Sequence, residues 1–163
     1  MAQLDERARG VFVIAPTPFR DDGALDEGSV ERMVDAFLAA GASGLTILGI
    51  MGEAPKLDAE EARRFVSLVL RRVDGRVPVI VGVSAPGFAA MRALARSSMD
   101  AGAAGVMVAP ASGLRGDDAV LSYMAQAAEA VDDAPGCCRT TRSSPASTSR
   151  PTWSAAWRNT RGW

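Results

Sequence analysis

The chain has 163 residues, of which 48% are hydrophobic, and its 18 basic residues nearly balance its 19 acidic residues. This length allows one domain with a hydrophobic core. The sequence contains no histidine, which excludes nucleophilic catalysis by a Ser-His or Cys-His pair within the chain.

Localisation and metal binding are constrained by composition as well. No apolar run reaches the roughly 18 residues that span a bilayer, and the polar, acidic N-terminal residues do not resemble a secretory signal. The two cysteines, Cys137 and Cys138, are adjacent and form no Cys-x-x-Cys spacing. We therefore expect a cytoplasmic protein with no membrane partner, no metal site and no cofactor.

Charge and composition change abruptly near residue 136. Residues 1–136 contain all 19 acidic residues and 13 of the basic ones, whereas residues 137–163 contain five arginines and no acid. The same C-terminal segment holds all three tryptophans and lacks Val, Ile, Leu, Phe and Met. We therefore expect a folded region over 1–136 and a tail over 137–163 that does not continue its core.

The first part of the folded region predicts two strands separated by a helix. A short apolar run predicts a buried strand over residues 11–15. Apolar residues at helical spacing predict a helix over 26–40, with Asp26 as its N-cap and Gly41 as its C-terminal stop. A second apolar run predicts a buried strand over 44–48.

The following residues repeat this alternation of strand and helix. Asp58 and Glu61 have the spacing of a capping box at the start of a helix over about 59–73. The next predicted elements are a strand over 77–83, a helix between Gly87 and Gly102, and a strand over 105–108. The last is a helix that begins near Asp117 and carries the apolar residues Val120, Leu121, Met124, Ala128 and Val131.

The order of these elements predicts the fold class. Strict alternation with fully apolar strands indicates a parallel sheet covered by helices, and the similarity of 40–49 to 101–110 favours a (β/α)8 barrel over a doubly wound sheet. A complete barrel has roughly 250 residues, so we predict an α/β fold over 1–136, the N-terminal half of a TIM barrel with about four βα units. The barrel interior is expected to be lined by Val13, Ile47, Val81 and Val108, or by the residues that alternate with them.

The candidate binding site is the turn after the second predicted strand, Gly49-Ile50-Met51-Gly52-Glu53, hereafter the 49–53 loop. Its glycines allow backbone amides to approach a ligand with no side chain in the way. In a parallel α/β fold, such a turn lies at the carboxyl end of a strand, where ligand sites are built.

Side chains outside and within this loop have alternative interpretations. Thr17 could face the barrel mouth or only end the first strand. Glu53 could contact a ligand, or only orient the loop or cap the next helix. Lys56, the single lysine, is expected to be a surface residue, Ser84 a helix cap and Tyr123 a packing residue.

Several segments match the pattern of one known family. GVFVIAPTPF at 10–19 is similar to that family's first strand and turn, and GIMGEAPKL at 49–57 is similar to its G-[TS]-T-G-E-x-x-x-L motif. Residues 101–110 are similar to its fourth strand, and Asp26 stands where the family has an acidic helix start. On this basis, residues 10–133 resemble the dihydrodipicolinate synthase / N-acetylneuraminate lyase family.

The resemblance implies a (β/α)8 barrel, usually tetrameric, that acts as a class I aldolase. In that family, a lysine on strand six forms a Schiff base with pyruvate or another 2-oxo acid, and tyrosines after strands four and five relay protons. The Gly-x-x-Gly-Glu loop holds the carboxylate. The resemblance therefore implies a small-molecule 2-oxo acid as ligand, a homo-oligomer, and a substrate site at Gly49, Ile50, Met51, Gly52, Glu53 and Thr17.

The chain departs from this pattern at the positions that carry the chemistry. Ile50 and Met51 stand where the family has a hydroxyl pair, and the tripeptide PAS at 110–112 stands where it has Pro-Tyr-Tyr. Lys56 follows the second strand, and the chain ends before a sixth strand. Because no other side chain forms an iminium with a ketone, we assign no catalytic residue and expect this chain to be inactive.

The tail over 137–163 admits an out-of-frame reading. A shift of one base permits residues 137–147 to read VLQDYPLVTGV, an apolar strand and turn that resemble the family's fifth strand. We therefore interpret the chain as a truncated, frameshifted member whose tail is disordered or out of frame.

Two alternative functions remain. The first is a non-catalytic module that binds a small carboxylate at the 49–53 loop. The second is nucleic-acid binding by charge and stacking through the basic tail, although the tail has no fold signature for it and nucleic acid is the less favoured partner.

Overall fold

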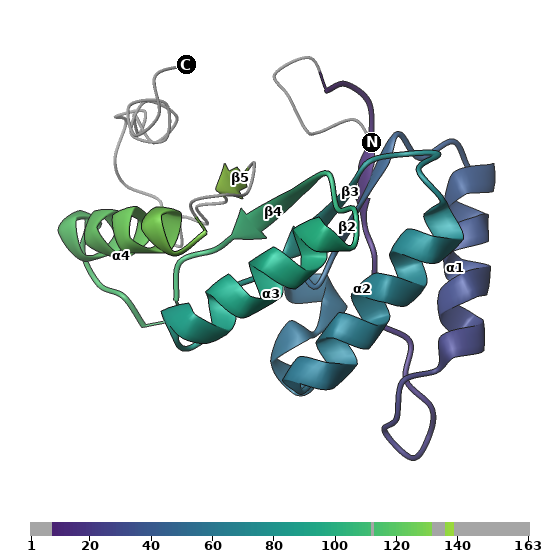
Figure 1. The fold of residues 1–163 in the computed structure, drawn as a ribbon, viewed down its shortest axis with the longest axis horizontal. Helices are drawn as coiled ribbons and strands as arrows, with labels where there is room; N and C mark the ends of the chain where they lie inside the picture. The colour runs from purple at the N-terminus through teal and green to yellow at the C-terminus, as the bar shows by residue number, and fades with distance from the viewer. Residues whose placement is uncertain (1–7, 112, 132–135, 139–163) are drawn as a thin grey trace.

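The computed structural model describes residues 8–111, 113–131 and 136–138, in which strands and helices alternate along the chain (Figure 1). Within these ranges, no helix is both long enough and apolar enough to cross a bilayer. The elements in chain order are β1 (Phe12–Ile14), α1 (Glu27–Ala39), β2 (Gly44–Ile47), the short 3-10 helices η1 (Ile50–Gly52) and η2 (Ala54–Lys56), α2 (Ala59–Val73), β3 (Val79–Gly82), α3 (Phe88–Asp100), β4 (Gly105–Val108), α4 (Asp117–Ala130) and β5 (Gly136–Cys138). The predicted α/β class with four strand–helix units is confirmed.

The strands form one parallel sheet in the order β1-β2-β3-β4-β5. The fifth strand is short, and its residues Cys137 and Cys138 pair with Met107 and Val108 of β4. The sheet therefore continues two residues beyond the predicted boundary at 136. Composition did not indicate this strand, because the hydrogen bonds of a ladder come from the backbone and need no apolar side chains.

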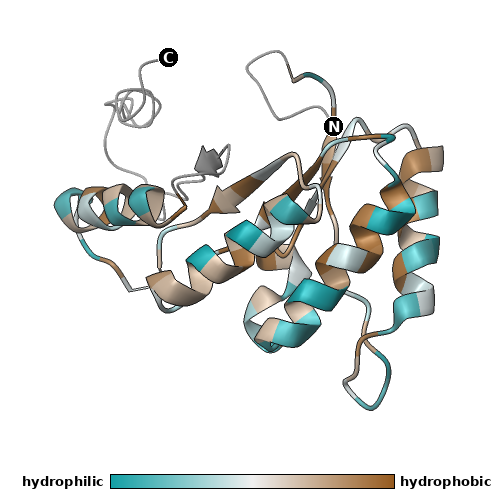
Figure 2. Ribbon diagram, viewed as in Figure 1, coloured by the Kyte–Doolittle hydropathy of each residue, from teal (hydrophilic) through white to brown (hydrophobic). Residues whose placement is uncertain are grey.

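One face of the sheet packs against the helices. The residues on this face are Val13, Leu45, Ile47, Val79, Val81, Val106 and Val108. Val13 is half-buried and packs against the core that the helices cover, and the other six are buried within it. Neighbouring helices pack in chain order, and Figure 1 shows α2 and α3 over the same side of the sheet. Hydrophilic residues follow the outer sides of these helices, whereas the strands are hydrophobic (Figure 2).

The opposite face of the sheet carries the residues that alternate with these. It consists of Phe12, Ile14, Gly44, Thr46, Ile80, Gly82, Gly105 and Met107, which lie side by side through the strand register. Phe12, Ile14 and Met107 are only half-buried, and none of the three packs in the helix-covered core. Of the two sets expected for the barrel interior, the structure thus selects this one, because Val13, Ile47, Val81 and Val108 face the helices.

The predicted starts of α1 and α2 are confirmed. The Ser29 hydroxyl and the Ser29 amide both donate to Asp26, and these bonds hold the pKa of its carboxyl below the usual value. The Glu61 amide donates to Asp58 over 2.8 Å, and the Asp58 amide donates to the Glu61 carboxylate over 3.0 Å, which completes a capping box. Gly41, with φ +83°, ends the first helix in a left-handed conformation.

Two ion pairs align α1 with α2. Arg64 pairs with Glu27, and Arg72 pairs with Asp35 through two guanidinium nitrogens. Both pairs join residues 37 positions apart, so the two helices run parallel with one fixed offset. The bond from Arg72 holds the pKa of the Asp35 carboxyl below its usual value. Because these side chains are largely solvent-exposed, the pairs define alignment more than they stabilise the fold.

Helix α4 packs through a face that includes Val120 and Val131 of the expected apolar set but not all of that set. Met124 is buried as predicted, but Leu121 is 44% exposed, and Ala127 and Ala130 are buried instead. The helix packs mainly against α3, and alanine allows a close approach of two helix backbones. The apolar pattern did not indicate the exposure of Leu121, because hydrophobicity alone does not describe the space between the helices.

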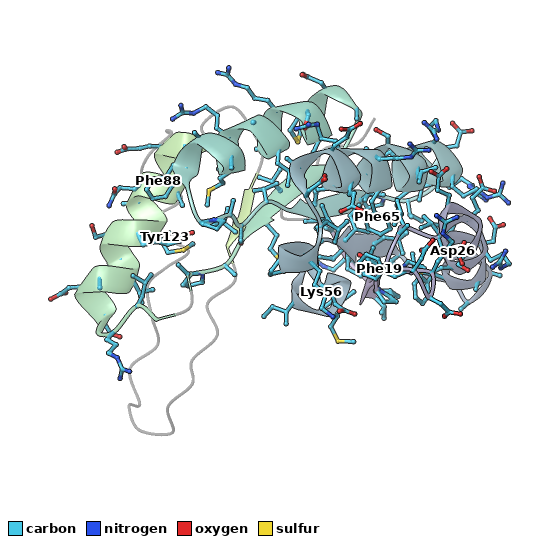
Figure 3. All side chains as sticks on the ribbon, turned by 90° about the horizontal axis from the view of Figure 1, so that it is seen from below. Phe19, Asp26, Lys56, Phe65, Phe88 and Tyr123 are labelled. Atoms are coloured by element: carbon cyan, nitrogen blue, oxygen red, sulfur yellow. The ribbon has the colours of Figure 1, made fainter. Side chains whose placement is uncertain are left out.

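An aromatic pair joins α3 to α4. The rings of Phe88 and Tyr123 lie with centroids 5.6 Å apart and are tilted by 35°, and the two residues are neighbours in Figure 3. Both residues pack against the core, and burial raises the pKa of the Tyr123 phenol. The prediction that Tyr123 is a packing residue is confirmed.

Ser98 of α3 provides a test of the packing beneath the helices. The residue is completely buried, and its hydroxyl has no hydrogen-bond partner among the described residues. Because a buried hydroxyl without a partner destabilises a fold, Ser98→Ala should raise the free energy of unfolding by about 1 kcal/mol, measured by urea denaturation.

The matched control for Ser98 is Ala95→Ser, one turn earlier on the same buried side of α3, where Ala95 is 2% exposed. This change adds a buried hydroxyl and should lower the urea midpoint. A lower midpoint for Ser98→Ala than for the unaltered chain would show that the Ser98 hydroxyl makes a stabilising bond.

Candidate functional site

The 49–53 loop lies at the carboxyl end of β2 and begins and ends in unusual backbone conformations. Leu48, immediately before it, has φ +53°, and Glu53, its last residue, has φ +51°. A left-handed conformation is disfavoured for residues with a Cβ atom, and it persists where surrounding contacts enforce it. The sequence did not predict either conformation, because neither residue is a glycine or an asparagine.

Two glycines allow the loop to lie close to the sheet. A Cβ atom on Gly82 of β3 would lie 2.1 Å from the Leu48 carbonyl oxygen, so only glycine fits there. A Cβ atom on Gly49 would lie 3.4 Å from the Met107 methyl group and 3.6 Å from a methyl of Ile14. The loop therefore covers the carboxyl end of the half-buried sheet face. A glycine inside an apolar strand is the sequence signal for such an approach.

Thr17 holds the loop from the β1 side. Its side chain is buried, with 4% exposure, and its hydroxyl donates to the Gly52 carbonyl oxygen over 2.6 Å. A Cβ atom on Gly52 would lie 3.3 Å from the Ala15 carbonyl oxygen, so the loop also packs on the end of β1. The structure brings Thr17 to the loop, whereas direct contact of Thr17 with a ligand remains a prediction.

The loop presents unpaired amides at the start of η1. The Gly52 amide donates to Gly49 over 3.0 Å and the Glu53 amide donates to Ile50 over 3.2 Å. In the part of the chain that the structure describes, the amides of Ile50 and Met51 donate to no acceptor. Their side chains are 71% and 63% exposed. Adjacent N–H groups without acceptors can bind an anion such as a carboxylate.

Glu53 and Lys56 interact with each other within the segment after β2. The Lys56 ammonium group pairs with the Glu53 carboxylate, and the two side chains are 69% and 41% exposed. Lys56 lies at the periphery of the molecule in Figure 3, which confirms the prediction of a surface lysine. Asp58 is the N-cap of α2, so the interpretation of Glu53 as that cap was wrong.

Ser84 ties the ends of β3 and β4 together. Its hydroxyl accepts a hydrogen bond from the Ala109 amide over 2.9 Å. The N-cap of α3 is Gly87, which makes no side-chain capping bond. The prediction of Ser84 as a helix cap was therefore wrong, because this serine follows β3 directly and lies too far before the helix.

The tripeptide at 110–112 stands where the resemblance places the tyrosines of a proton relay. The structure describes Pro110 and Ala111 of this tripeptide, and Ser112 lies outside the described residues.

Metal binding has no support from side-chain clustering. Over residues 8–111, 113–131 and 136–138, no group of three or more His, Cys, Asp or Glu side chains could hold a metal ion. The candidate site is therefore built from backbone amides, the Thr17 hydroxyl and the Glu53–Lys56 pair.

Comparisons with known proteins agree in pointing to one family. The model of the dihydrodipicolinate synthetase family matches residues 7–133. A 4-hydroxy-tetrahydrodipicolinate synthase from Thiobacillus denitrificans is 36% identical over 133 residues, which cover 81% of this chain and 45% of that protein. The chain thus spans less than half the length of this relative.

Solved structures show the same fold. The dihydrodipicolinate synthase from Rhodopseudomonas palustris has a TM-score of 0.80 and 53% identity, over 85% of this chain and 46% of that chain. The Proteus mirabilis N-acetylneuraminate lyase has a TM-score of 0.74 at 20% identity, over 83% of this chain and 47% of that chain. The second likeness shows the fold alone.

The contact between Gly82 and Leu48 generates a prediction. In Gly82→Ala, the new methyl group would overlap the Leu48 carbonyl, so the turn after β2 must shift. We expect the free energy of unfolding to fall by about 3 kcal/mol, measured by urea denaturation. Gly28→Ala in α1 is the control, because its Cβ would meet a flexible arginine at 3.4 Å and an Asp26 carboxylate oxygen at an ordinary contact distance of 3.7 Å. It should stabilise by roughly 0.5–1 kcal/mol. An unchanged midpoint for Gly82→Ala would show that the turn is not fixed against β3.

Proposed function

Because this chain belongs to the dihydrodipicolinate synthetase family, we propose that its 49–53 loop binds the carboxylate of pyruvate or another 2-oxo acid. The relatives that it matches include 4-hydroxy-tetrahydrodipicolinate synthases, which are lyases. The reaction class proposed for the parent fold is a class I aldolase reaction through a Schiff base, and a homo-oligomer is proposed with it.

The observation that carries the proposal is the pair of adjacent amides at Ile50 and Met51. Neither donates to an acceptor within the described residues, and both lie at the carboxyl end of β2. A carboxylate can accept both N–H groups, because each of its oxygens has free lone pairs. Since the side chains of Ile50 and Met51 have no hydroxyl group, backbone amides supply the proposed recognition.

The Schiff-base step needs an amine that this site does not present. A neutral lysine amine attacks the ketone carbon to give a carbinolamine, which loses water and leaves an iminium. Lys56 is the single lysine of the sequence, and its ammonium group points into solvent beside Glu53. We therefore propose that this chain binds the oxo acid without forming the covalent intermediate, so that it is inactive as a lyase.

A non-catalytic carboxylate-binding module is the second candidate, and the same two amides favour it. It differs from the first candidate in its ligand, which is any small carboxylate and need not be a 2-oxo acid. Nucleic-acid binding through 137–163 concerns a segment that lies, apart from the backbone of β5, outside the described residues, and it remains a prediction.

The proposed function is tested on the full chain with pyruvate. In amide NMR spectra, pyruvate should shift the resonances of Ile50 and Met51, whereas hydroxyacetone, a ketone without a carboxylate, should not. After borohydride treatment with pyruvate, the mass of the chain should be unchanged. Shifts that are absent from the loop would contradict carboxylate binding there. An adduct lost in Lys56→Arg would identify Lys56 as a nucleophile.

The out-of-frame interpretation of the tail remains a proposal with its own test. The coding sequence for residues 137–147, read with a shift of one base, should encode VLQDYPLVTGV or a close variant. In the present reading frame, these codons encode CCRTTRSSPAS. A stop codon immediately after the shift in that frame would refute the interpretation.

A further inference from the structure

We infer that Thr17 is a positioning residue for carboxylate binding, because its buried hydroxyl fixes the turn that carries the Ile50 and Met51 amides. This inference rests on the proposed function of the 49–53 loop. Thr17 lies on the segment after β1, 35 residues before its acceptor Gly52. Its role is thus a contact between two loops at the carboxyl edge of the sheet.

The loop needs such a contact because its backbone is strained. Leu48 and Glu53 both have left-handed φ values, a conformation that residues with a Cβ atom adopt only where the surroundings enforce it. Among the described residues, the hydroxyl of Thr17 makes the one hydrogen bond to the 49–53 loop that comes from outside residues 49–57.

The geometry connects Thr17 to the amides in two steps. The hydroxyl donates to the Gly52 carbonyl over 2.6 Å, which sets the orientation of the peptide between Gly52 and Glu53. The amide of Gly52 in turn donates to Gly49 over 3.0 Å and closes the η1 turn. Because the Ile50 and Met51 amides lie inside this turn, fixing its end fixes their direction.

The local sequence makes Thr17 a rigid donor. It stands between Pro16 and Pro18, and each proline restricts its own φ angle and the conformation of the residue before it. Thr17 is also buried, with 4% exposure, so solvent does not compete for its hydroxyl. A hydroxyl held in this way can fix a loop at little cost in conformational entropy.

The test compares Thr17→Val, which keeps the shape but loses the hydroxyl, with Thr17→Ser, which keeps the hydroxyl. Full-length chains are titrated with pyruvate by NMR, and the solvent exchange of the Gly52 and Glu53 amides is measured without ligand. Thr17→Val should weaken pyruvate binding by about tenfold and accelerate this exchange by a similar factor. Thr17→Ser should restore both quantities.

Ser84→Ala is the matched control, because it removes the other side-chain bond between loops at this edge, from the Ala109 amide. It should leave pyruvate affinity and exchange in the 49–53 loop unchanged. Exchange at Val106 and Val108 of β4 reports on the fold as a whole, and it should not change in Thr17→Val.

Failure of this inference can be distinguished from failure of the proposed function. If the unaltered chain shows no pyruvate-induced shift at Ile50 and Met51, the proposed function fails, and the exchange data still test Thr17. Equal loop exchange in Thr17→Val and the unaltered chain would overturn the positioning role. Equal pyruvate affinity would overturn it as well. If Thr17→Val accelerates exchange at Val106 and Val108 as much as in the 49–53 loop, Thr17 stabilises the whole fold and does not position the loop specifically.

Discussion

The parallel ladder of β1 to β5 is the constraint on which the rest of the structure depends. Since successive side chains point to opposite faces, its register decides that Val81 and Val106 pack beneath the helices. The same register aligns Ile80 with Thr46 on the other face. It also brings the carboxyl ends of neighbouring strands to one edge, where the 49–53 loop meets Thr17.

Most of the fold could be predicted because short sequence patterns, each spanning a few residues, define the helix starts and the strands. The capping box of Asp58 and Glu61 defined the start of α2, and apolar runs defined four strands. Two features that the sequence did not indicate depend on partners distant in sequence. Ser84 bonds to Ala109, 25 residues away, and the exposure of Leu121 depends on where α3 lies. Local pattern contains no information on such contacts, because tertiary geometry determines them.

The location of the candidate site could be predicted from the sequence, whereas the contacts that hold its backbone in place could not. The glycines of the 49–53 loop indicated that backbone amides would be available, and the structure leaves two of them without acceptors in the described chain. The left-handed Leu48 could not be foreseen, since its conformation depends on Gly82 of a different strand. Thr17 was recognised as a candidate from its position after β1, whereas its partner Gly52 required the fold.

The two loop-to-loop bonds at the carboxyl edge divide that edge mechanically. Thr17 joins the loops after β1 and β2, and Ser84 joins those after β3 and β4. Within the described residues, no side-chain hydrogen bond joins the second loop to the third. We therefore expect the edge to be stiff within each of these two pairs of loops and more flexible along the seam between the pairs. Across this seam, the 48–53 segment lies close to Gly82 of β3 and Met107 of β4 without a side-chain hydrogen bond among the described residues. Slow opening motions at the carboxyl edge of the sheet are expected along that seam, between the amides of the 49–53 loop and the end of β3.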